Sequence, residues 1–70
     1  MTDQQAHARL VEVEFHNAGF VTDRFNASVH ISLSNRKVSK MEIETFLEQH
    51  FEGCAFTVES VNDGVEVTVE

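Results

Sequence analysis

The segment Ser39 to Gly53 carries the strongest signals for local structure in the chain. Apolar and aromatic side chains recur in it at helical spacing, namely Ile43, Phe46, Leu47, His50 and Phe51. Ser39 is followed three residues later by Glu42, a pair that can cap the first turn of a helix, and Gly53 supplies a residue suited to the left-handed end of a helix. The segment therefore predicts a helix with one apolar side, which a second layer of structure must cover.

Residues on either side of this helix alternate between apolar and polar, as in strands with one buried face. Over residues 9–16, Val11, Val13 and Phe15 alternate with Glu and His, which predicts a strand; a helix through Ala6, Leu10 and Val13 is the competing interpretation. Residues 1–8 lack a period and are expected to form a flexible tail.

The second predicted strand runs from residue 25 to residue 34. Its inward residues are Phe25, Ala27, Val29, Ile31 and Leu33, and its outward residues are Asn26, Ser28, His30, Ser32 and Ser34. A hairpin that pairs Phe15 with Phe25 keeps the apolar residues of both strands on one face, although another overlap would do the same. Phe20, in the loop between them, is expected to cover one end of the core.

A second hairpin follows the helix, with strands over residues 54–61 and 65–70. A turn at Asn62-Asp63 would place Glu59 opposite Glu66, and facing like charges destabilise a sheet, so a turn at Asp63-Gly64 is predicted instead. The expected fold is an α+β single domain, 1–70, with two layers in the order β-β-α-β-β and one helix on one face of a four-stranded sheet.

Charge is divided sharply along the chain. The net charge is −7, made up of −3 over residues 1–23, +4 over residues 24–41 and −8 over residues 42–70. Direct binding to nucleic acid needs Lys and Arg to neutralise phosphates, so a chain this acidic is not expected to bind nucleic acid itself. The acidic residues either keep a small domain soluble or imitate phosphates and occupy the basic groove of a nucleic-acid-binding protein.

The glutamates expected to bind such a partner fall into two groups. Glu44, Glu48 and Glu52 form a row on the outer side of the helix, where like charges and the helix dipole make them unfavourable for stability. The second group is expected on the open sheet face and consists of Glu12, Glu14, Glu59, Glu66 and Glu70. This expected inhibition is the behaviour of phage-encoded anti-restriction and anti-CRISPR proteins, to which the chain is similar in size and charge.

Catalytic and metal sites are not expected. The four histidines lack metal-binding spacing, no glycine-rich phosphate loop occurs, and Cys54 is assigned to a buried strand position without a neighbouring base. With one cysteine, no signal peptide and no long apolar segment, a cytoplasmic protein is expected. The sequence thus predicts a non-enzymatic acidic protein without cofactor that binds and inhibits a partner protein. The alternative is a homodimeric interaction module formed through a free sheet edge or face.

Overall fold

The structure is a computed structural model that describes residues 3–70. It contains two helices and four strands, which are α1 (Asp3–Asn17), β1 (Val21–Phe25), β2 (Ser28–Ser32), α2 (Lys40–His50), β3 (Phe56–Val61) and β4 (Gly64–Val69). The predicted α+β class and four-stranded sheet are confirmed. The predicted β-β-α-β-β order with one helix is wrong, since the order is α-β-β-α-β-β.

The N-terminal segment is a helix, in place of the predicted tail and first strand. Ala8, Val11 and Phe15 are fully buried, and their spacing of three and four residues places them on one side of α1. The centroid of the Phe15 ring lies 4.1 Å from the ring centroid of Phe46 on α2 and 5.5 Å from that of Phe20. Phe20 therefore covers one end of the core, as expected. Residues 3–8 belong to α1, whereas residues 1 and 2 of the predicted tail lie outside the described residues.

The first hairpin is formed by β1 and β2, later in the chain than predicted. The turn is Asn26-Ala27, with Asn26 at a positive φ of 55°, and it pairs Phe25 with Ser28. Val29 and Ile31 are buried as predicted, but Phe25 lies on β1 and is 79% exposed. The pairing of Phe15 with Phe25 is wrong because Phe15 belongs to a helix.

The helix α2 begins and ends near the predicted positions. The Ser39 side chain accepts a hydrogen bond from the Glu42 backbone N–H at 3.2 Å, which caps the helix. Gly53 has a φ of +83°, the left-handed conformation expected beyond a helix end.

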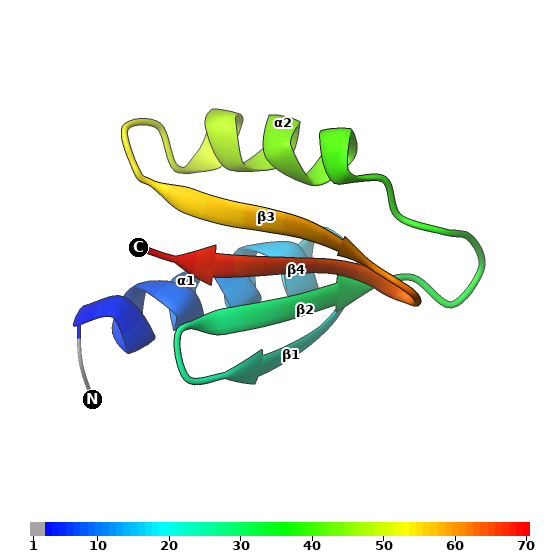
Figure 1. Cartoon of the computed structure of the whole chain (residues 1–70), viewed down its shortest axis with the longest axis horizontal. Helices are drawn as coiled ribbons and strands as arrows, with labels where there is room; N and C mark the ends of the chain where they lie inside the picture. The colour runs from blue at the N-terminus through cyan, green and yellow to red at the C-terminus, as the bar shows by residue number, and fades with distance from the viewer. Residues whose placement is uncertain (1–2) are drawn as a thin grey trace.

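Both helices cover one face of an antiparallel sheet whose strand order is β1-β2-β4-β3. A single core joins Val29 and Ile31 of β2 and Val65, Val67 and Val69 of β4 to the buried residues of both helices. In Figure 1, α1 lies behind the sheet, and α2 lies along the outer side of β3. Among the strands, α2 packs mainly on β3 and α1 on the other three. The opposite sheet face has no helix among the described residues.

Candidate functional site

The three glutamates predicted to form a row on the helix lie beside a groove. Glu44 and Glu48 belong to α2, whereas Glu52 lies just beyond its end at His50, so the predicted helical row is correct for two of the three. Glu44, Glu48 and Glu52 are exposed, and all three line a groove of about 400 Å³ between α2 and β3. The apolar part of this groove is formed by Leu47, Phe51, Phe56 and Val58. One side of the molecule thus combines apolar surface with three carboxylates and no basic residue in the lining.

The open face of β3 and β4 carries further carboxylates. The turn is Asn62-Asp63, which places Glu59 directly opposite Glu66, so the register predicted from charge is wrong. The observed register pairs Phe56 with Val69 and Val58 with Val67 on the core face, and two apolar pairs outweigh one solvent-facing like-charge pair. Glu70 follows β4, and its carboxylate accepts a hydrogen bond from the Thr57 hydroxyl at 2.9 Å.

We refer to Glu44, Glu48, Glu52, Glu59, Glu66 and Glu70 as the β3 acidic surface. The first three lie on the α2 side of β3 and the last three on the open sheet face, so they flank this edge strand on both sides. Within residues 3–70, none of the six is within ion-pair distance of a Lys or Arg side chain. No Lys or Arg side chain of residues 3–70 therefore neutralises this surface at ion-pair distance.

The two remaining predicted residues, Glu12 and Glu14, lie elsewhere. Both belong to α1 because residues 9–16 form a helix and not an outer strand of the sheet. Glu12 is partly buried, and the Glu14 carboxylate lies 3.8 Å from Nδ1 of His50. Their assignment to the open sheet face is wrong, and we exclude them from the β3 acidic surface.

Three basic residues, Arg36, Lys37 and Lys40, lie away from the β3 acidic surface. Arg36 donates two hydrogen bonds to the Glu42 carboxylate, at 2.9 and 2.6 Å. These bonds lower the pKa of Glu42 and raise the pKa of Arg36. Lys37 and Lys40 line a second groove at the opposite end of β3, together with Ser60 and Val61. The edge of β3 is therefore acidic near Phe56 and basic near Val61.

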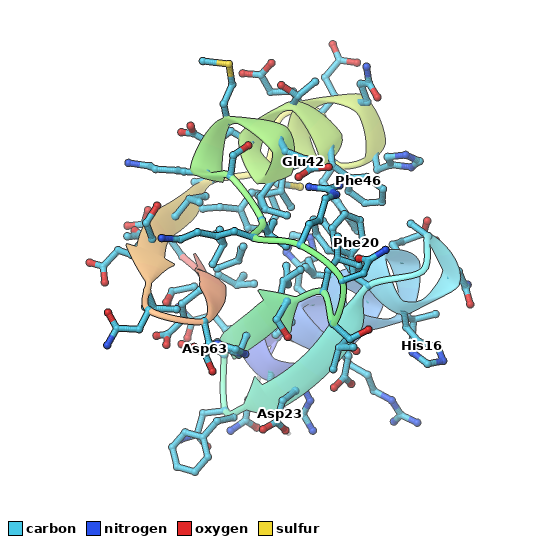
Figure 2. The ribbon with its side chains drawn as sticks, turned by 90° about the vertical axis from the view of Figure 1, so that its right-hand side faces the viewer. His16, Phe20, Asp23, Glu42, Phe46 and Asp63 are labelled. Atoms are coloured by element: carbon cyan, nitrogen blue, oxygen red, sulfur yellow. The ribbon has the colours of Figure 1, made fainter. Side chains whose placement is uncertain are left out.

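A polar row crosses the open face and was not predicted from the sequence. The strand pairing aligns Asp23, His30, Glu66 and Glu59 in that order across the four strands. Nε2 of His30 lies 3.0 Å from Oδ1 of Asp63 in the β3–β4 turn. Figure 2 shows Asp23 on β1 and Asp63 in this turn, both in the half of the molecule away from α2. Only the strand order and register reveal this row, because its members are far apart in sequence.

Cys54 is exposed, and not buried as predicted, because it lies in the connection before β3. It borders the groove between α2 and β3. Among residues 3–70, no group of three or more His, Cys, Asp or Glu side chains is arranged to hold a metal ion. None of the helices in this part of the chain is both long and apolar enough to cross a membrane.

No protein-family model, curated protein or solved structure matches the chain. The fold and the site together define a small α+β domain with an acidic surface around one edge strand of its sheet.

Proposed function

We propose that this chain is a non-enzymatic binding protein whose β3 acidic surface docks on a basic surface of a partner protein. In the specific form of this proposal, the partner binds nucleic acid and the chain inhibits it by occupying its basic groove. The observation that carries the proposal is the set of six carboxylates that flank β3 without a Lys or Arg partner in residues 3–70.

The placement of charge on α2 supports a role in binding. Lys40 stands at the positive end of the helix dipole and Glu48 near the negative end, and Glu44 and Glu48 bring like charges together at four-residue spacing on α2. Each of these features lowers helix stability by a few tenths of a kcal/mol. A partner with Lys and Arg would relieve this repulsion and would associate rapidly at low salt.

A capture experiment with nucleic acid as competitor tests the proposal. The immobilised chain is exposed to lysate of its source organism at low salt, and bound proteins are eluted with a short DNA duplex and identified. We expect a nucleic-acid-binding protein in the eluate and its loss at about 0.5 M salt. The variant Glu44→Gln/Glu48→Gln/Glu52→Gln should capture about tenfold less of it.

The matched control removes the same charge from α1 by the changes Asp3→Asn, Glu12→Gln and Glu14→Gln. This variant should capture the partner nearly as well as the native chain, because its altered residues lie outside the β3 acidic surface. Equal losses in both variants would mean that total charge alone governs capture, and the proposed site would be rejected.

A homodimeric interaction module is the second candidate, and β1 favours it. This strand is the other edge of the sheet, and its Val21 and Phe25 are 55% and 79% exposed. Light scattering should then show a dimer that persists at high salt and that the variant Phe25→Ser converts to a monomer. A native monomer at all concentrations tested would eliminate this candidate.

A further inference from the structure

We infer that the outer edge of β3 and the adjoining groove form a strand-addition site for an extended segment of a partner protein. In that segment, apolar residues alternate with Lys or Arg. This inference rests on the proposed function and specifies how the β3 acidic surface would engage its partner.

The hydrogen-bond pattern shows which backbone groups of β3 are directed outward. The Glu70 N–H donates to the Ala55 carbonyl at 3.2 Å, so this pair is hydrogen-bonded. Because such pairs alternate in antiparallel sheets, Thr57 and Glu59 also point their backbone groups toward β4. The N–H and C=O groups of Phe56, Val58 and Ser60 then point to the free edge. An extended segment can pair with these groups, as in other cases of strand addition.

The groove supplies the side-chain specificity. Neighbouring residues in adjacent strands share a face, so every second side chain of an added strand would lie beside Phe56 and Val58 on the α2 side. Leu47 and Phe51 complete this apolar surface. The intervening side chains would point to the open face, toward Glu59. Apolar residues are thus favoured at alternate positions.

Charge determines the remaining preference. Glu44 and Glu48 of α2 and Glu52 just after it line the groove, and Glu59 lies on the open face, to which the intervening side chains of the segment would point. The surroundings of this edge are therefore acidic and favour Lys or Arg at those intervening positions. Lys37 and Lys40 lie at the Val61 end of the strand. The basic residues of the segment should therefore lie nearest the Phe56 end.

A second copy of the chain fits this edge less well than a bare segment. The helix α2 packs on β3 more than on any other strand, and two copies joined through β3 would bring their α2 helices over neighbouring strands. Adjacent strands are about 4.8 Å apart, whereas packed helices need about 8–10 Å. The pairing would also place the acidic rows of both copies close together.

Synthetic peptides of about eight residues provide the probe, a length that matches the edge of β3. A capped peptide alternating Val and Arg should bind saturably in a fluorescence-anisotropy titration, and its Val/Glu counterpart at least tenfold more weakly. Methylation of the peptide nitrogens on alternate residues, in the register that pairs with β3, removes the donors and should weaken binding about tenfold.

Amide hydrogen exchange of the native chain gives a direct structural readout. On peptide binding, the N–H groups of Phe56, Val58 and Ser60 should become protected, whereas those of Thr57 and Glu59 are already protected by β4. The variant Ser60→Pro removes one outward N–H and should weaken binding about fivefold, while Ser60→Ala should not. Light scattering of the mixture establishes whether the complex contains one copy of the chain.

The outcomes separate this inference from the proposed function. No saturable binding of the Val/Arg peptide, no alternating protection, or dimerisation through β3 would overturn strand addition. If the Glu44/Glu48/Glu52 variant nevertheless loses the DNA-competed partner, the proposed function stands without it. If that variant keeps its partner, the proposed function fails even where the peptide binds.

Discussion

At Gly64 the backbone of β4 passes so close to β2 that no side chain can be placed between them. A Cβ atom built on Gly64 would overlap the Ile31 carbonyl oxygen and crowd the Ser32 side chain. Gly53 differs, because it needs glycine for its φ of +83° while the space around it is open. The two glycines thus serve a steric and a conformational requirement respectively.

We predict that Gly64→Ala destabilises the protein more than Gly53→Ala does. The first change forces β2 and β4 apart at a backbone atom that cannot rotate away, which should cost about 2–3 kcal/mol. The second requires a left-handed alanine and should cost about 1 kcal/mol. Urea unfolding of both variants measures the difference. A Gly64→Ala variant as stable as the native chain would contradict the close approach of β4 to β2.

Glu42 uses its backbone and its side chain for different partners. Its backbone N–H donates a hydrogen bond to the Ser39 hydroxyl, as the capping signal predicted, whereas its carboxylate accepts hydrogen bonds from Arg36. The hydrogen bond from Arg36 holds the pKa of Glu42 below its usual value. The resulting stabilisation is complete above the usual pKa of a glutamate and is lost as the pH falls through the lowered pKa of Glu42.

We therefore predict that the native chain and Glu42→Gln differ most in unfolding free energy near neutral pH and converge in strong acid. The difference should be small because the pair is solvent-exposed. Urea unfolding at a series of pH values from 7 to about 2 checks this. A gap that is constant or grows toward acid would show that the carboxylate acts through something other than its charge.

The residues of α1 fit two periodic patterns. Val11, Val13 and Phe15 alternate as in a strand, yet Ala8, Val11 and Phe15 also have helical spacing. The structure buries the second set and leaves Leu10 and Val13 exposed. Tertiary packing against Phe46 and the sheet selects the helix, and no local signal of comparable strength exists over these residues.

We predict that Phe15→Ala destabilises the chain by about 3–5 kcal/mol, since the Phe15 side chain of α1 is fully buried and packs on Phe46 of α2. The matched control in the same helix is Leu10→Ala. Leu10 is 60% exposed, so this change should alter stability by no more than about 0.5 kcal/mol. Thermal unfolding of both variants tests whether α1 belongs to the core. If the two variants lost equal stability, α1 would not be packed on the core through Phe15.

The elements that the sequence predicts well are those with their own start and stop signals. The helix α2 has a cap at Ser39 and a glycine at Gly53, and the β3–β4 hairpin has a turn between two alternating segments. The β3–β4 register was predicted wrongly because the prediction used only the repulsion between Glu59 and Glu66, whereas the observed register is favoured by apolar pairs on the core face. Helical spacing predicted the glutamates of the site that lie on α2. The predicted place of Glu12 and Glu14 is wrong because residues 9–16 form part of a helix and not the predicted strand.

For the whole molecule, the distribution of charge is the property that links stability with function. The segment from residue 42 to residue 70 has a net charge of −8, and six of its glutamates lie on the two sides of β3. Mutual repulsion within this surface lowers stability in the isolated chain, and the repulsion is strongest at low salt. A surface selected for stability alone would be expected to intersperse acidic with basic residues.

We predict that Glu44→Gln/Glu48→Gln/Glu52→Gln is more stable than the native chain at low salt, by about 0.5–1 kcal/mol, because like-charge pairs and an unfavourable carboxylate near the end of α2 are removed. The gain should shrink as salt screens the charges. The α1 control variant lacks this benefit, since Asp3 lies in the first turn, where the helix dipole favours an acid. Thermal unfolding at low and high salt measures both variants. A triple variant that gains stability while losing its partner would show that the acidic row serves binding at the expense of folding, whereas a loss of stability would mean that these glutamates support the fold itself.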